Sequence, residues 1–248
     1  MSGAVPTARV PPIASVPASL GHPRVHLRST DSTNDRAREL ALAGAPHGTL
    51  VTAGEQTAGR GRQGRRWSAP AGSALLMSLL LREPPALLPL IAALAVADVA
   101  GEQARIKWPN DVVLVRDDGL AKLAGILAEG RPQEGWAVLG IGLNVAVRIE
   151  DLPAELHATA ATLGREPTEV ESVLDALLGA LTRRLAEPAE RTLGQWRERD
   201  ALRGRAISWN GGEGTAEGVD GNGRLVVALS GGGSTTLDAG EVHLRSSG

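Results

Sequence analysis

The stretch GEQTAGRGRQGRRWSAP, residues 54–70, places four arginines among glycines between two apolar segments. The four are Arg60, Arg62, Arg65 and Arg66. No acidic residue occurs between Glu55 and Glu83 to neutralise them. Glycine lets a backbone approach a ligand closely, and each planar guanidinium group can grip two phosphate oxygens. The segment therefore favours an anion-binding loop over a solvated basic loop. We expect its charges to be unpaired and to hold the loop open until an anion binds.

The segments on either side of this loop predict a sheet with a helix before it. GTLVTAGEQ (48–56) and SALLMSLLL (73–81) read as strands that flank the loop. STDSTNDRARELALAG (29–44) begins with good N-cap residues and ends at a glycine, as a short helix does. ALLPLIAALAVADVA (86–100) has 15 residues, too few to span a bilayer, and predicts a buried helix. The chain is therefore expected to be soluble.

Strands and helices also alternate beyond residue 100. RIKWPNDVVLV (105–115) reads as strand, tight turn and strand, and two more strands follow within 121–130 and 135–145. A helix is predicted from Thr168, with a capping box formed by Thr168 and Glu171. A second helix around Trp196 is expected to end near Arg203.

Three regions follow from these patterns. Residues 1–23 are interrupted by prolines and read as a flexible leader, residues 24–203 as the main domain, and residues 204–248 as a small β-domain. Short strands joined by glycine-rich turns predict that last region. The fold class is therefore α+β, with most of the chain in one large domain.

Composition limits the classes of function. The formal net charge of −2 argues against a general nucleic-acid binder, although a non-catalytic nucleic-acid module that uses the arginine loop stays as a remote alternative. The chain has no cysteine, so it can form no disulfide, which fits the cytoplasm. Phe and Tyr are absent too, so that aliphatic residues and Trp must build the core.

Four further motifs accompany the arginine loop: DSTN (31–34), KWPNDV (107–112), KLAGIL (122–127) and GIGLNV (140–145). The loop itself lacks the Lys-Ser/Thr of a Walker A motif, and GIGLNV lacks the third glycine of a Rossmann fingerprint, which favours close sheet packing there. Taken together and in this order, the five motifs closely resemble those of biotin protein ligases. The resemblance runs from about residue 25 to the C-terminal GEVHLR, and its arginine-glycine signature differs from that of lipoate-protein ligases.

The resemblance implies a fold and a reaction. The fold would be a mixed, largely antiparallel sheet with helices, of the class II synthetase type, with a C-terminal SH3-like barrel. Biotin and ATP, with Mg²⁺, would give biotinyl-5′-AMP, and a lysine of a biotin carboxyl carrier protein would then take the biotin. No tightly bound prosthetic group is expected. A lipoate or other acyl ligase of the same fold is the alternative.

The same resemblance has implications for binding to membranes, DNA and a second copy of the chain. We expect no membrane association, and no DNA binding, because the residues before the core are too few for a helix-turn-helix. A homodimer is left open.

The resemblance also assigns site residues. Those expected to bind biotin are Ser32, Thr33, Asn34, Gln56, Arg60, Gly61, Arg62 and Lys122. Those expected to bind ATP or the adenylate are Arg62, Arg65, Trp67, Lys107, Asn110, Lys122 and Asn144. The catalytic candidates are Lys122, Arg60, Arg62 and Asp111. Asp111 could hold Mg²⁺ or accept the proton of the incoming lysine, and Trp67 could stack on adenine or pack against the sheet.

Overall fold

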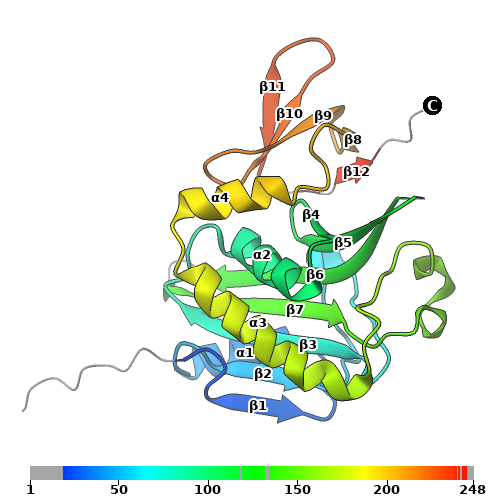
Figure 1. Ribbon diagram of the computed structural model, residues 1–248. Helices are drawn as coiled ribbons and strands as arrows, with labels where there is room; N and C mark the ends of the chain where they lie inside the picture. The colour runs from blue at the N-terminus through cyan, green and yellow to red at the C-terminus, as the bar shows by residue number, and fades with distance from the viewer. Residues whose placement is uncertain (1–18, 118, 132–133, 239, 241, 245–248) are drawn as a thin grey trace, which may run out of the picture.

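The computed structural model describes residues 19–117, 119–131, 134–238, 240 and 242–244. A seven-stranded sheet forms its centre, in the order β1-β2-β3-β7-β6-β5-β4 (Figure 1). β1 runs parallel to β2, and every other neighbouring pair is antiparallel. The strands are β1 (Arg24–Leu27), β2 (Leu50–Ala53), β3 (Ala74–Arg82), β4 (Ala104–Lys107), β5 (Asp111–Arg116), β6 (Gly119–Arg131) and β7 (Trp136–Asn144). The mixed, largely antiparallel sheet predicted from the sequence is confirmed.

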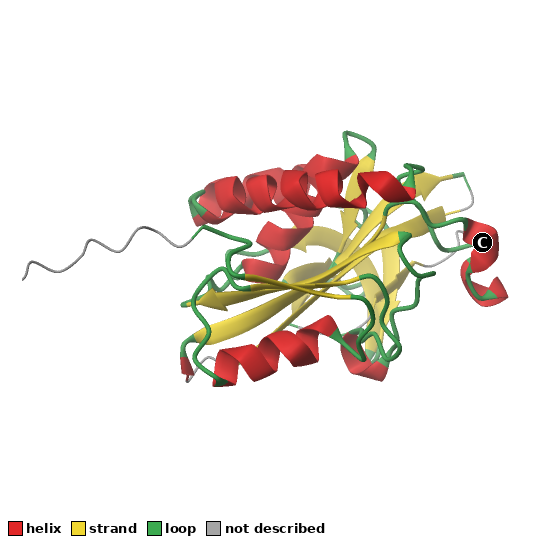
Figure 2. Ribbon diagram, turned by 90° about the horizontal axis from the view of Figure 1, so that it is seen from below, coloured by secondary structure: helices red, strands yellow, loops and turns green. Residues whose placement is uncertain are grey.

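Helices cover both faces of this sheet, as Figure 2 shows. The helices are α1 (Thr33–Leu42), α2 (Leu88–Ala100), α3 (Val170–Leu185) and α4 (Ala189–Glu198). α1 lies over β2, β3 and β7, where its Ala37 and Ala41 pack with Val51, Leu80 and Val138. On the opposite face, α2 and α3 pack against the sheet and against each other and enclose the main core.

α2 is buried on almost every side, which explains its unbroken apolar sequence. Pro89 lies in its first turn, where a missing backbone N–H costs nothing. No helix within the described part of the chain combines the length and apolar character that crossing a bilayer requires.

A second sheet of five strands occupies the C-terminal region, beyond α4 in Figure 1. Its order is β11-β10-β9-β8-β12, and every neighbouring pair is antiparallel. The strands are β8 (Ala206–Trp209), β9 (Gly212–Val219), β10 (Leu225–Ala228), β11 (Ser234–Leu237) and β12 (Val242–Leu244). The short strands that the sequence predicts for this region are present.

This small sheet shares its core with the main sheet. Ile207, Ala216 and Leu225 belong to the same buried cluster as α2 and β3. In addition, the indole of Trp108, buried between β4 and β5, donates a hydrogen bond to the carbonyl of Gly223 at 3.1 Å. The boundary expected near residue 204 therefore marks a change of sheet within a continuous apolar core.

Two predicted details of the helices are wrong. The capping box forms between Glu166 and Glu169 rather than Thr168 and Glu171, because a short 3₁₀ turn precedes α3 and moves its start. Glu171 binds the guanidinium group of Arg24 instead. α4 ends at Glu198, before the expected Arg203, because the next residues pair with β4 through the backbone of Ile106.

Residues 19–23, the last part of the expected leader, contact the folded chain. Gly21 donates its backbone N–H to Gly48 at 2.9 Å, and Leu20 packs against the core. Residues 1–18, the rest of that prediction, lie outside the described residues.

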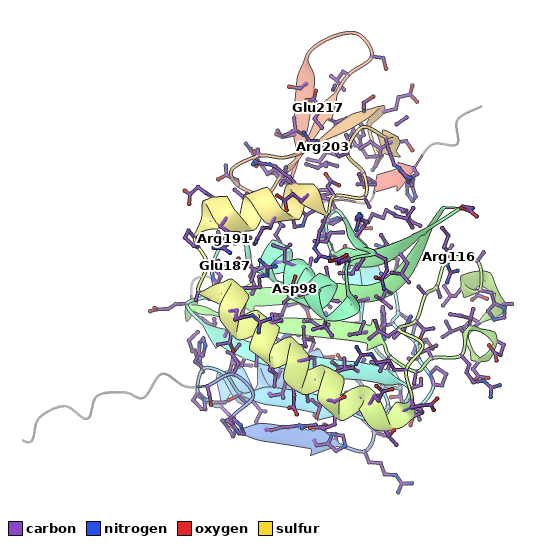
Figure 3. All side chains as sticks on the ribbon, in the orientation of Figure 1. Asp98, Arg116, Glu187, Arg191, Arg203 and Glu217 are labelled. Carbon is purple, nitrogen blue, oxygen red and sulfur yellow. The ribbon has the colours of Figure 1, made fainter. Side chains whose placement is uncertain are left out.

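Charged side chains join the helices on the core side of the sheet. Asp98 of α2 and Glu187, just beyond α3, lie near each other in Figure 3. Arg184 donates to both carboxylate oxygens of Asp98 at 2.8 Å and to the carboxylate of Glu187 at 2.9 Å. The helix layer is therefore held by paired charges as well as by apolar contacts.

The turn between β9 and β10 offers a test of the shared core. Gly223 has a φ of 78°, and a Cβ there would lie 3.1 Å from Leu87. Gly223→Ala should therefore lower the free energy of unfolding by ~1–3 kcal/mol, because it adds both backbone strain and crowding. The control is Gly221→Ala in the same turn, where an added Cβ meets nothing within 4 Å. Equal denaturation midpoints for the two variants would contradict the account.

Candidate functional site

A cavity of about 250 Å³ opens on the face of the sheet that α1 partly covers. Its walls come from the start of α1, the arginine loop and the segment 152–160, and its floor from β3, β6 and β7. Twelve of the lining residues are ones that the sequence predicts for the site: Ser32, Thr33, Asn34, Gln56, Arg60, Gly61, Arg62, Arg65, Trp67, Asn110, Lys122 and Asn144. Segments far apart in the chain thus meet at one hollow.

Three glycines leave the floor of the cavity without side chains at their positions. A Cβ on Gly140 would overlap the amide of Asn34, and one on Gly142 would lie 2.5 Å from the indole of Trp67. A Cβ on Gly125 would lie 3.1 Å from the same indole. The close packing expected of GIGLNV is confirmed, because Asn34 and Trp67 fill the space that side chains on these strands would need.

Buried polar side chains at the start of α1 form one wall. Ser32, Thr33 and Asn34 are each at most 4% exposed. Gln56 accepts hydrogen bonds from the backbone N–H of Thr33 at 2.7 Å and from its hydroxyl at 3.1 Å. Ser78 donates to the amide oxygen of Asn34 at 2.6 Å.

Helix capping alone does not explain this wall, since Ser32 at the N-cap makes no side-chain capping bond. Ser78 was missed from the sequence. Its signal is a polar residue within the otherwise apolar run of β3, where it is fully buried.

A β-bulge in β6 places Lys122 in the cavity. The pairing of β6 with β5 skips Leu123, so Leu123 and Ala124 both face the core and are fully buried. Lys122 and Gly125, on either side of them, consequently share the cavity face. The strand can thus carry a lysine within an apolar sequence without burying its charge in the core.

The ammonium group of Lys122 has two partners. Its Nζ lies 2.8 Å from Oδ1 of Asp111, which is only 18% exposed. It also lies 5.7 Å from the ring centre of Trp67, within the range of a cation–π contact. Trp67 packs against the sheet, as one of its two expected roles requires, and also lines the cavity. Asp111 itself is not among the residues that line the cavity.

The arginine loop is folded back on itself. Arg60 and Arg66 form a single antiparallel bridge, and the backbone N–H of Gly61 donates to the carbonyl of Arg65 at 2.7 Å. Arg66 donates to the carbonyl of Thr57 at 2.9 Å. The bond within the loop shapes it as a small hairpin, with Arg62–Gly64 as a 3₁₀ turn at its tip.

The expectation of unpaired charge in this loop is wrong for Arg60. Its guanidinium group binds Asp35 at 2.6 Å and Glu129 at 2.7 Å. These acids lie on α1 and β6, far from the loop in sequence, so a search for nearby acids could not find them. Arg62 lies deeper, and burial lowers its pKa, an effect that neighbouring Arg65 reinforces and Asp111 opposes.

The other predicted residues divide into two groups. Asn110 donates to the carbonyl of Ile126 at 3.1 Å, and Asn144 donates to that of Ala161 at 2.8 Å; both line the cavity. The amide oxygen of Asn144 is buried without a hydrogen-bond partner. Lys107, by contrast, ends β4 and is not among the lining residues, so its grouping with the cavity is not supported.

The segment after β7 was also missed from the sequence. Leu152, Leu156, Thr159 and Ala160 line the cavity beside Lys122. The carbonyl of Thr159 accepts the backbone N–H of Lys122 at 2.6 Å. Short 3₁₀ turns build this segment, and no regular periodicity marks them in the sequence.

Metal ligands are sparse. In the parts of the chain that the structure describes, no three His, Asp or Glu side chains gather where they could hold an ion. Asp111, the tentative magnesium ligand, already contacts Lys122.

The fit between Gly142 and Trp67 gives a test of the cavity floor. Gly142→Ala should destabilise the fold by ~1–3 kcal/mol, because the added methyl group must displace the indole. Gly179→Ala on α3 is the control, since its nearest atom would be a flexible arginine tip at 3.7 Å. Chemical denaturation of both variants checks this. A loss for Gly142→Ala no larger than that for the control would contradict the packing described.

Comparisons with known proteins agree with this site. Residues 26–145 match the model of the biotin/lipoate A/B protein ligase family. The chain is 34% identical to the biotin–[acetyl-CoA-carboxylase] ligase of Mycobacterium tuberculosis, with 87% of each chain covered. It is 35% identical to the protein of that name from Paracoccus denitrificans, over 81% of this chain and 92% of the relative.

Other relatives are longer. The chain is 40% identical to the bifunctional ligase/repressor BirA of Bacillus spizizenii, but the match spans only 49% of that protein.

Among solved structures, the biotin protein ligase from Aquifex aeolicus in complex with biotin and ATP is similar, with a TM-score of 0.75 and 27% identity. The match covers 90% of this chain and 99% of that one. Sequence relatives and a structural relative thus agree over most of the chain, and on these grounds it belongs to the biotin protein ligase family.

Proposed function

We propose that this protein is an ATP-dependent ligase that activates biotin as biotinyl-5′-AMP and transfers it to a lysine of a biotin carboxyl carrier protein. One observation carries the proposal. Apart from Lys107, every residue predicted to bind biotin or ATP lines a single cavity, and Asp111, a predicted catalytic residue, contacts the lysine that lies in it. Action in the cytoplasm belongs to the same proposal.

The polar wall suits the ring end of biotin. A ureido group has two N–H donors and one carbonyl acceptor, and the wall offers hydroxyl and amide groups of both kinds. Met77, Ile126 and Leu127 line the floor beside it and would contact the apolar chain. Aliphatic residues and Trp67 thus take the place of the Phe and Tyr that the chain lacks.

In the first step, a carboxylate oxygen of biotin would attack the α-phosphorus of ATP. The new O–P bond forms as the bond to pyrophosphate breaks, which leaves the acyl adenylate. Two anions must meet, and the ammonium group of Lys122 would neutralise the charge that builds up between them. Arg62 and Arg65, on the same side of the cavity, would bind phosphate oxygens.

Asp111 positions Lys122 in this proposal. Their 2.8 Å contact would hold the amine in place at the cavity. Mg²⁺ would balance phosphate charge, held mainly by the nucleotide, since such sites need only one or two protein carboxylates.

In the second step, the amine of a carrier lysine would attack the carbonyl carbon of the adenylate and release AMP. That lysine would enter past the arginine loop, where Arg65 is exposed and Arg62 is partly exposed. The proton of the amine would go to solvent or to a carboxylate after AMP leaves.

The proposal is tested by incubating the chain with ATP, Mg²⁺, biotin and a carrier domain, followed by intact mass measurement of the carrier. The carrier should gain one biotinyl group, and only when ATP is present. Lipoic acid serves as the competing substrate. A carrier that gains lipoyl but no biotinyl would overturn the assignment in favour of a lipoate ligase.

Substitution of Lys122 tests its role in the first step. Lys122→Ala should lower the rate of adenylate formation by ~10²–10³, because a preorganised positive charge is lost where negative charge develops. Biotin-dependent exchange of pyrophosphate into ATP measures this rate. Thermal melts should show a folded variant, since alanine fits an apolar strand.

The matched control is Arg116→Ala, which removes an exposed cation at the end of β5 (Figure 3). Its exchange rate should equal that of the unmodified chain. Near-normal exchange by a folded Lys122→Ala variant would remove Lys122 from the mechanism.

A further inference from the structure

Glu129 links two parts of the site that the sequence keeps apart. Its Oε2 accepts a hydrogen bond from the amide nitrogen of Asn34 at 2.8 Å, at the polar wall. Its Oε1 accepts one from Arg60 at 2.7 Å, at the arginine loop. Glu129 lies on β6, seven residues after Lys122 in sequence and on the same cavity face of the sheet. One carboxylate therefore touches both the wall and the loop.

Asp35 is the second carboxylate that binds the guanidinium group of Arg60 in the loop. It accepts from the other terminal nitrogen of Arg60 at 2.6 Å, so carboxylates occupy both ends of this guanidinium group. Arg38 lies beside the same acids, 3.4 Å from Asp35 and 3.2 Å from Glu129, but belongs to α1. Of the two arginines, only Arg60 can transmit the pairing to the loop.

These contacts change the expected role of Arg60. A guanidinium group already held at both ends by carboxylates is poorly placed to bind a phosphate as well. Arg62 and Arg65, two and five residues further along, line the cavity. The loop thus has one arginine that anchors it and others that face the cavity.

We propose that Glu129 is a positioning residue that, through Arg60, docks the arginine loop against the polar wall. The proposal rests on the proposed function and deepens it. When the carboxylate is present, the loop and the Asn34 amide are held in one hydrogen-bonded unit. The loop is then already docked when a ligand binds at the wall. Docking the loop therefore does not reduce the free energy of binding.

The test variant is Glu129→Gln, which keeps the size of the side chain and can still accept a bond from Asn34. It removes one of the two charges that hold Arg60. Arg38→Gln is the matched control, because it removes another ion pair to the same carboxylate without touching the loop. Asp35→Asn is a second variant, which weakens the grip on Arg60 from the α1 side.

The first readout is limited trypsin digestion without ligand, with cleavage after Arg60 to Arg66 followed by mass. It requires no enzyme activity, so it remains informative even if biotin is not the substrate. Glu129→Gln and Asp35→Asn should be cut in the loop several-fold faster than the unmodified chain, roughly in proportion to the undocked fraction. Arg38→Gln should be cut at the unmodified rate.

The second readout is steady-state kinetics of adenylate formation. Glu129→Gln should raise the KM for biotin ~5-fold and change kcat less than about twofold, because binding must now also dock the loop. Two results would overturn the proposal. One is loop cleavage of Glu129→Gln no faster than that of Arg38→Gln. The other is a fall in kcat with an unchanged KM, which would place Glu129 in the chemistry itself. An unmodified chain that forms no adenylate from biotin would contradict the proposed function and leave the digestion result to decide the role of Glu129.

Discussion

The absence of three side chains shapes the site more than any one interaction. Gly125 on β6 and Gly140 and Gly142 on β7 leave three positions on the cavity face without side chains. Asn34 and Trp67 fill the space above them. Any side chain at Gly140 or Gly142 would displace these groups. The polar wall, the indole and the hollow between them therefore depend on the bare floor. The same sheet carries the main core on its other face, so one set of strands serves both stability and function.

Lys122 carries a charge within an apolar strand, and a β-bulge in β6 keeps that charge out of the core. The bulge at Leu123 lets two successive residues face the core, so that the alternation of the strand resumes with Lys122 on the cavity side. Asp111 on the neighbouring strand pairs with the amine, which avoids an isolated charge at a half-buried place. Lys122 is thus held by its strand, its ion pair and the indole of Trp67.

The sequence predicted the strands and helices well, because long apolar runs and glycine turns are local signals. Each of the five motifs also contributes residues to the cavity lining. Local signals could not reveal contacts between distant segments. Glu129 and Asp35 neutralise Arg60 from β6 and α1, and Glu171 pairs with Arg24 rather than capping α3. Sequence spacing carries no information on such pairs until the sheet brings them together.

The central claim is that a carboxylate oxygen of biotin attacks the α-phosphorus of ATP. The most direct test is whether an oxygen atom passes from the acid to the nucleotide. Biotin labelled with ¹⁸O in its carboxylate would be incubated with the chain, ATP, Mg²⁺ and a carrier domain, and the nucleotides would be analysed by mass spectrometry. The account predicts one ¹⁸O atom in the AMP released for each biotinyl group transferred, because the bridging oxygen of the adenylate leaves with the phosphate. Unlabelled AMP, or label in inorganic phosphate together with ADP, would contradict it.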